Sequence, residues 1–137
     1  MDQRYIDYYF SLKNVWQLHV RNNFGKSPDI PSGFSESLCR HLFDLDKTNT
    51  INDASNSEDE IEIKATGTHE GKTTISRSND FKFLIWMYFD FNKDELKTYK
   101  LSRHMFDLDK GIGRKSIRLR TIIKNNTIDP EIFKFIQ

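Results

Sequence analysis

The feature that most constrains the fold is a mostly apolar run of strand length, Phe81 to Phe91. Such a run is typical of a strand that is buried on both faces of a sheet. Turn-forming residues 92–94 follow it, and residues 95–101 then alternate between apolar and polar. We therefore predict a buried central strand that pairs with the next strand along the chain.

The segment upstream of this run, residues 59–68, alternates over its first half. Ile61 and Ile63 are apolar, whereas Glu62 and Lys64 are charged. A period of two over β-branched apolar residues predicts a half-buried strand. In such a strand the two isoleucines point into the core, and Glu62 and Lys64 project side by side from the other face.

A polar, turn-rich segment, residues 48–57, comes just before this strand. Its pattern predicts a short strand over residues 50–54, and residues 56–59 have the composition of a hairpin turn. Two strands joined in this way would bring Asp53 near Glu62. The hairpin would therefore place two carboxylates from neighbouring strands beside Lys64.

Helices are predicted before and after the strands. Apolar residues recur at helical spacing over residues 2–24, where Gly25 supplies the stop. A second helix begins near Ser32, has Glu36 in its first turn and runs to Leu45. The other predicted elements are a loop over 65–80, a short helix over 102–110, a strand over 115–123 and a last short helix from 129–130. The expected fold class is α/β of the mixed α+β kind, with a mixed sheet of four to five strands flanked by helices.

The size and composition of the chain indicate how many domains it forms and in which compartment it is expected to work. A length of 137 residues predicts one domain, residues 1–137, around one core. No apolar run of about 18 residues is present, so no membrane span is expected. The N-terminus carries acids where a secretory signal would be basic. The single cysteine, Cys39, excludes an internal disulfide framework and fits a reducing compartment, so a cytoplasmic location is expected.

The net charge of +1 says nothing by itself about nucleic acid, but the charges are unevenly distributed. Residues 1–64 hold seven basic and eleven acidic residues, whereas residues 65–137 hold fourteen and nine. Between Lys110 and Lys124 six residues are basic and none is acidic. Binding to a phosphate backbone would need such a basic stretch, although a solvated strand and loop would show the same pattern.

Asp53, Glu62 and Lys64 together suit the hydrolysis of a phosphodiester. This reaction needs metal ions to neutralise the developing charge, an activated water and a stabilised leaving oxygen. Magnesium prefers carboxylate oxygens, so Asp53 and Glu62 are candidate metal ligands. Lys64 could hold the attacking water and help to neutralise the phosphate. Glu36, on the preceding helix, could bind a metal directly or through water.

Other interpretations of these residues remain open. Glu62 and Lys64 can be a surface ion pair of a non-catalytic nucleic-acid-binding or protein-binding module. Glu36 can be a carboxylate that the helix dipole favours. A second Glu-x-Lys, residues 95–97, follows Asp90, but it starts at a turn. No glycine-rich phosphate loop follows a strand, so no organic cofactor is expected.

A helix that bears an acid, an acid that ends one strand, and (Asp/Glu)-x-Lys on the next strand together resemble the PD-(D/E)xK nuclease superfamily. The matching residues are Asp53 and Glu62-Ile63-Lys64, with Asn52 where the superfamily has proline. A longer part of the chain, residues 30–102, resembles small type II restriction endonucleases. The resemblance rests on residues 31–36, 60–66, 71–75 and 83–89.

This resemblance implies a restriction-endonuclease-like core and magnesium-dependent cleavage of double-stranded DNA. Such enzymes are homodimers that cut short, sometimes interrupted, GC-rich palindromes. The alternative within the superfamily is a structure-specific repair nuclease or a junction resolvase. The residues expected to contact DNA carry hydrogen-bond donors in the loop after the Glu62 strand and on the basic strand: Lys72, Thr73, Thr74, Arg77, Arg114, Lys115, Arg118 and Arg120.

Overall fold

The structure is a computed structural model that describes residues 1–48, 52–56, 59–108 and 113–137. Its helices are α1 (Gln3–Asn22), α2 (Ser32–Phe43) and α3 (Leu119–Asn126), with a 3₁₀ helix η1 (Arg103–Phe106). Its strands are β1 (Ala54–Ser55), β2 (Glu60–Thr66), β3 (Lys72–Ser76), β4 (Phe83–Asp90), β5 (Glu95–Ser102), β6 (Arg114–Arg118) and β7 (Glu131–Lys134).

A five-stranded sheet with the order β1-β2-β4-β5-β7 forms the centre of the molecule. β2 and β4 are parallel, and the other neighbouring strands are antiparallel. β4 lies in the middle, and every residue of it after Phe83 is buried. The prediction of a buried central strand in a mixed sheet flanked by helices is therefore confirmed.

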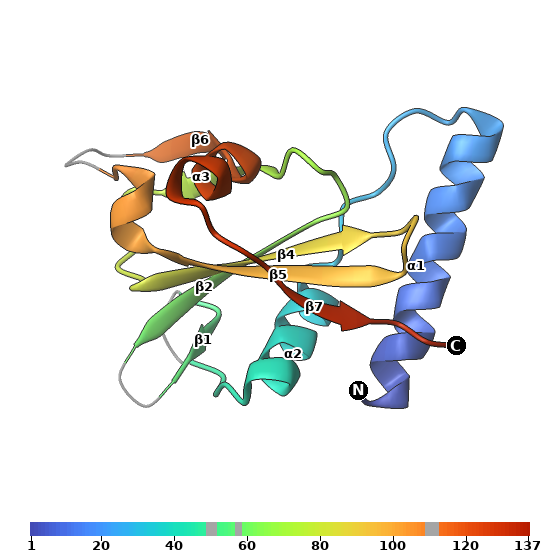
Figure 1. The fold of residues 1–137 in the computed structure, drawn as a ribbon, viewed down its shortest axis with the longest axis horizontal. Helices are drawn as coiled ribbons and strands as arrows, with labels where there is room; N and C mark the ends of the chain where they lie inside the picture. The colour runs from blue at the N-terminus through green and yellow to red at the C-terminus, as the bar shows by residue number, and fades with distance from the viewer. Residues whose placement is uncertain (49–51, 57–58, 109–112) are drawn as a thin grey trace.

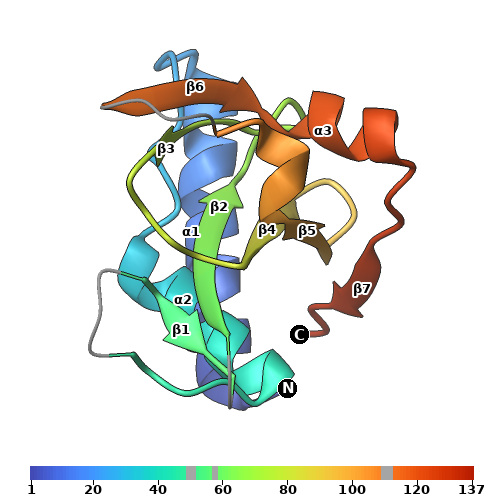
Figure 2. The same ribbon diagram turned by 90° about the vertical axis from the view of Figure 1, so that its left-hand side faces the viewer.

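Alternate residues of β4 pack into two separate cores, one on each face of the sheet. Ile85, Met87 and Phe89 belong to a first core that α1 and α2 cover. Leu84 and Trp86 belong to a second core, together with side chains from β3, η1 and α3. Figure 1 shows α2 below the sheet and β6 and α3 above it, and Figure 2 shows the same two layers from the side. Covering layers on both faces explain why β4 is almost continuously apolar.

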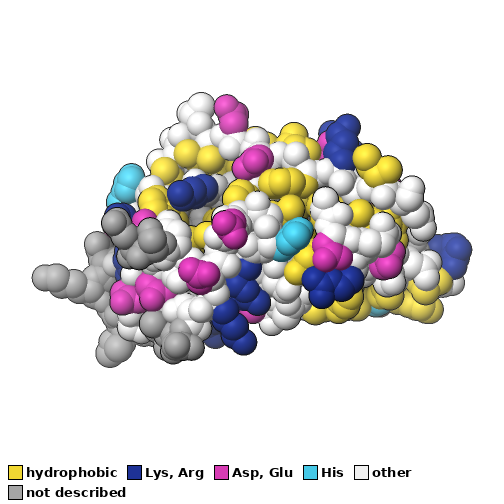
Figure 3. Space-filling model, turned by 90° about the horizontal axis from the view of Figure 1, so that it is seen from below, with side chains coloured by type: hydrophobic (Ala, Val, Ile, Leu, Met, Phe, Trp, Pro, Cys, Tyr) yellow, Lys and Arg dark blue, Asp and Glu magenta, His cyan; other side chains and the backbone are white. Residues whose placement is uncertain are grey.

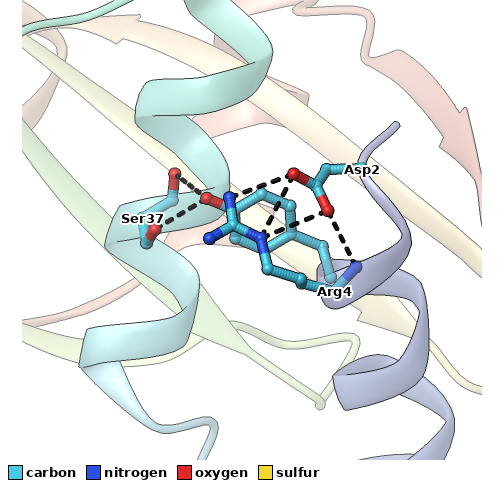
Figure 4. Close-up of polar contacts among 4 residues, drawn as sticks. Asp2, Arg4 and Ser37 are labelled. Atoms are coloured by element: carbon cyan, nitrogen blue, oxygen red, sulfur yellow. Dashed lines mark hydrogen bonds and ion pairs between the residues drawn. The ribbon is translucent and has the colours of Figure 1, made fainter.

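The first helix is fixed to the second by polar contacts near its N-terminus. Asp2 caps α1, because its carboxylate accepts a hydrogen bond from the backbone N–H of Arg4 at 2.9 Å. In the same first turn of α1, the hydroxyl of Tyr5 lies 2.7 Å from Oγ of Ser37 in α2 (Figure 4). This contact helps to hold α2, which carries Glu36, in position.

The predicted loop over residues 65–80 is wrong in part, because it contains β3. β3 pairs antiparallel with β6, from Lys72 opposite Arg118 to Ser76 opposite Arg114, and forms a separate two-stranded sheet. We call this pair of strands the β3–β6 ribbon. Only Ile75 of β3 is buried, so the strand has no apolar alternation to reveal it. The predicted strand over 115–123 is too long, because α3 begins at Leu119.

The predicted C-terminal helix is also wrong. Glu131–Lys134 form β7, which pairs antiparallel with β5. The outer edge of β5 offers unpaired backbone N–H and C=O groups. Pairing with these groups outweighs the helical preference of a segment that is too short to form a stable helix alone.

The remaining helix predictions hold with shorter bounds. α1 lies inside the predicted range, and α2 ends at Phe43, because Asp44 adopts a left-handed conformation. η1 covers part of the predicted helix over 102–110, of which residues 109–110 lie outside the described residues. Across the described part of the chain, the helices are too short or too polar to cross a membrane.

The turn between β2 and β3 passes very close to the sheet. Gly71 has a φ of +64°, and a Cβ atom at this position would lie 2.6 Å from Cζ2 of Trp86. Only glycine fits both the positive φ and the close approach. The carbonyl of Gly71 also accepts a hydrogen bond from the backbone N–H of Leu119 at 3.0 Å. The β3–β6 ribbon is thus fixed against the second core directly after the strand that carries Glu62 and Lys64.

Candidate active site

β2 places Glu62 and Lys64 as its alternation predicts. Ile61 and Ile63 are buried in the first core, and the two charged side chains project from the opposite face. Nζ of Lys64 lies 3.6 Å from Oε1 of Glu62, and the Lys64 side chain is 22% exposed. The ammonium group is therefore held beside the carboxylate while part of it still reaches solvent.

Asp53 lies next to this pair, one residue before β1. Its Oδ2 accepts a hydrogen bond from the backbone N–H of Ile63 at 2.7 Å. Its own backbone N–H donates to the carbonyl of Ile61, and Arg40 of α2 donates to its carbonyl at 3.2 Å. The hairpin thus brings Asp53 to Glu62 as expected, although residues 50–51 of the predicted strand and 57–58 of its turn lie outside the described residues.

Two of the three carboxylates at this site, those of Glu36 and Glu62, have raised pKa values. Burial raises the pKa of Glu62 from 4.5 to about 7, and the charge of Asp53 adds to the rise. Burial also raises the pKa of Glu36 to about 7, with a further contribution from a side-chain hydrogen bond to Asp53. The positive charge of Lys64 lowers both pKa values, but this effect is smaller than the rise, so both remain near 7. We call Glu36, Asp53 and Glu62 the acidic cluster.

The acidic cluster fits a divalent cation by its donor chemistry. Its ligand atoms are carboxylate oxygens, which hard cations such as magnesium prefer. A cation between them would also favour the ionised carboxylates, which burial and the nearby charge of Asp53 disfavour. Among the described residues, no group of three or more His, Cys, Asp or Glu side chains is arranged to hold a metal by itself. Magnesium ordinarily uses only one or two protein carboxylates and completes its shell with water and phosphate oxygens.

Asn79 is a member of this site that the sequence did not predict. Its side chain is buried, and its Nδ2 donates a hydrogen bond to Oε2 of Glu62 at 2.6 Å. Arg103 holds the loop that carries it, because its guanidinium donates to the carbonyls of Asn79 and Arg77. Asn79 is seventeen residues from Glu62 along the chain. No local pattern marks the residue, so only the packing of the loop reveals it.

The second Glu-x-Lys, residues 95–97, lies elsewhere in the sheet and has a structural explanation. Asp90 Oδ1 accepts hydrogen bonds from the backbone N–H groups of Asn92 and Lys93, so Asp90 caps the turn between β4 and β5. Lys97 forms an ion pair with the other oxygen of Asp90 at 3.4 Å. Lys97 therefore pairs with an acid as Lys64 does, but that acid, Asp90, stabilises a turn.

The predicted DNA-contacting residues separate into two groups. Two of them are engaged inside the protein. Lys115 donates to the carbonyls of Phe106 and Asp107, and the guanidinium of Arg120 lies 4.8 Å from the centre of the Trp86 ring. The other six lie on the β3–β6 ribbon or just beyond it: Lys72, Thr73, Thr74, Arg77, Arg114 and Arg118.

Comparison with known proteins gives a match at the level of a family. The model of the family described as Bsp6I restriction endonuclease matches residues 2–127. The match includes the acidic cluster, Lys64, Asn79 and the β3–β6 ribbon. No curated protein sequence matches the chain.

Proposed function

Since the chain belongs to the Bsp6I restriction endonuclease family and is therefore a type II site-specific deoxyribonuclease, we propose that it cuts double-stranded DNA at a short GC-rich palindrome with magnesium at the acidic cluster. The observation that carries this proposal is the convergence of Asp53, Glu62 and Lys64 around the middle of β2. The chain acts as one nuclease domain in the cytoplasm.

In this proposal each member of the site has a separate role. Asp53 and Glu62 hold the magnesium ion, and Glu36 binds it directly or through water. The bound ion supplies charge neutralisation at the phosphate and lowers the pKa of a water molecule. Lys64 positions the attacking water and stabilises the negative charge that develops on the phosphate oxygens. Asn79 favours the ionised form of the Glu62 carboxylate and fixes its orientation.

A palindromic site further suggests a homodimer, because a two-fold axis places one active site on each DNA strand. The surface offers apolar area for such contacts. Val20 is 63% exposed and Phe24 is 66% exposed at the end of α1. Figure 3 shows the underside of the molecule, where hydrophobic side chains reach the surface in patches among charged and polar ones. These features support the homodimer proposal.

The proposal predicts that magnesium stabilises the protein more at about pH 8 than at about pH 6. The pKa of Glu36 and of Glu62 is about 7, against 4.5 for an unperturbed glutamate. Folding therefore takes up protons between these values, and the metal-free fold loses stability as the pH rises through this window. Magnesium binds the deprotonated carboxylates and restores this stability. Thermal unfolding with and without magnesium tests the prediction, and an equal rise in Tm at both pH values would contradict it.

Replacing Asn79 by alanine is expected to raise the magnesium concentration for half-maximal cleavage by about 10-fold or more. The substitution removes the hydrogen bond to Oε2 of Glu62, which helps to keep that carboxylate ionised. Cleavage rates over a series of magnesium concentrations measure the change. The matched control is Asn126→Ala, because Asn126 bonds only its own helix on the surface. If Asn79→Ala shows the same magnesium dependence as the wild type, Asn79 does not contribute to magnesium binding.

Sequencing the ends of cut phage DNA tests the proposed specificity. We expect the ends to align on one short palindrome. Cleavage confined to branched junctions, with linear phage DNA left intact, would instead identify a structure-specific nuclease. Binding without any cleavage in magnesium would favour a non-catalytic nucleic-acid-binding module.

A further inference from the structure

The two faces of the β3–β6 ribbon differ in chemistry. One face packs on the second core through Ile75, which is 1% exposed, and Ile117. The other face, which we call the outer ribbon face, has no apolar and no acidic residue. It consists of three directly opposed cross-strand pairs: Lys72 and Arg118, Thr74 and Ser116, and Ser76 and Arg114. Cations therefore lie at both ends of this face and hydroxyl groups lie between them.

We infer that the outer ribbon face enters the major groove of the DNA and reads base edges there, an inference that rests on the proposed function. The major groove is wide enough for a two-stranded β-ribbon. Arginine can donate two hydrogen bonds to O6 and N7 of one guanine, and a serine or threonine hydroxyl can donate or accept. Arg118 and Lys72 thus supply readers for guanine, and Thr74 and Ser116 supply adaptable readers beside them.

The side chains on this face are available for DNA. Lys72, Arg114, Ser116 and Arg118 are exposed. Arg118 forms an ion pair with Glu70 at 3.6 Å, but both side chains are more than half exposed, so the pair is weak and exchangeable. Lys115, on the inner face, is bound to backbone carbonyls instead. The basic stretch of the sequence therefore divides into one set that stabilises the fold and one set that faces solvent.

The ribbon is connected to the acidic cluster at both ends of β3. β2, which carries Glu62 and Lys64, leads through Gly71 directly into Lys72. The segment after Ser76 leads to Asn79, which donates to Glu62. Base contacts on the outer ribbon face could thus shift the loop that carries Asn79, and Asn79 orients the Glu62 carboxylate. In this way β3 would connect base recognition to the active site.

Arg118→Lys tests the inference, because lysine keeps the charge but loses the two-pronged geometry. The cut site is first read from the DNA ends that the wild type produces. Binding is then measured with duplexes that contain this site or carry one altered base pair. We expect Arg118→Lys to lose about 5- to 150-fold in discrimination at one base pair. Its affinity for a random-sequence duplex and its salt dependence should stay unchanged. The matched control is Arg21→Lys on α1, which should discriminate like the wild type.

Thr74→Val provides a second, uncharged test of the same face. It removes one hydroxyl at nearly constant volume, and we expect reduced discrimination without a change in the salt dependence of binding. The inference is overturned if Arg118→Lys discriminates like the wild type and Arg118→Ala weakens binding to every duplex equally. In that case the salt slope would fall by about one, as expected for a phosphate contact. A wild-type protein that makes no discrete cuts would instead overturn the proposed function.

Discussion

Replacing Lys64 by alanine is expected to reduce the rate of DNA cleavage by about 100- to 1000-fold. Nζ of Lys64 lies 3.6 Å from Oε1 of Glu62, where it can stabilise charge that develops at the phosphate. The side chain is partly exposed and lies outside both cores, so its removal should leave the fold intact. Single-turnover cleavage at saturating enzyme measures the chemical step without the contribution of binding.

The second Glu-x-Lys supplies a matched control for this substitution. Lys97 also pairs with an acid, at 3.4 Å from Asp90, and its side chain is buried to a similar degree. Because Asp90 closes a turn, Lys97→Ala should cleave at nearly the wild-type rate. Loss of cleavage in Lys97→Ala, with activity retained in Lys64→Ala, would move the active site to residues 90–97.

Glu62→Gln is expected to abolish the magnesium response, with a loss of cleavage of roughly 1000-fold, which is several kcal/mol of barrier. Glutamine keeps the size of the side chain but is a poor ligand for a hard cation. Burial and the charge of Asp53 disfavour the ionised form of Glu62. The neutral variant should therefore be at least as stable as the wild type at about pH 8 without metal.

Loss of activity together with unchanged or higher stability is the signature of a functional charge cluster. Thermal unfolding of Glu62→Gln, with and without magnesium, measures the stability of the variant and its response to the metal. The unfolding temperature should not rise when magnesium is added. A less stable variant that still responds to magnesium would show that Glu62 has a structural role and that the metal binds elsewhere.

The sequence predicts the parts of the fold that local patterns encode. The alternation of Ile61 and Ile63 with charged neighbours predicts β2, and the run from Phe81 predicts β4. It also predicts that Asp53 meets Glu62, because a hairpin between neighbouring strands leaves few other arrangements. The proximity of Asp53, Glu62 and Lys64 can thus be predicted from the sequence, since it follows from strand periodicity and a short hairpin connection.

The sequence does not predict contacts that depend on distant partners. β3 is polar on one face and is stabilised by pairing with β6, some forty residues later. β7 forms because the edge of β5 is open, and nothing in residues 131–134 encodes that edge. Asn79 reaches Glu62 from a loop that Arg103, a residue of η1, helps to hold. Nor does the sequence predict that the guanidinium of Arg120, at the start of α3, lies over the Trp86 ring.

The most direct test of the active site is cleavage of phage DNA by the wild type, Lys64→Ala, Glu62→Gln and Glu95→Ala, with magnesium or with EDTA. We predict discrete fragments from the wild type and Glu95→Ala in magnesium. We predict intact DNA from Lys64→Ala and Glu62→Gln, and from every protein in EDTA. Discrete fragments from folded Glu62→Gln, or fragments from the wild type in EDTA, would contradict a magnesium-dependent site built on β2.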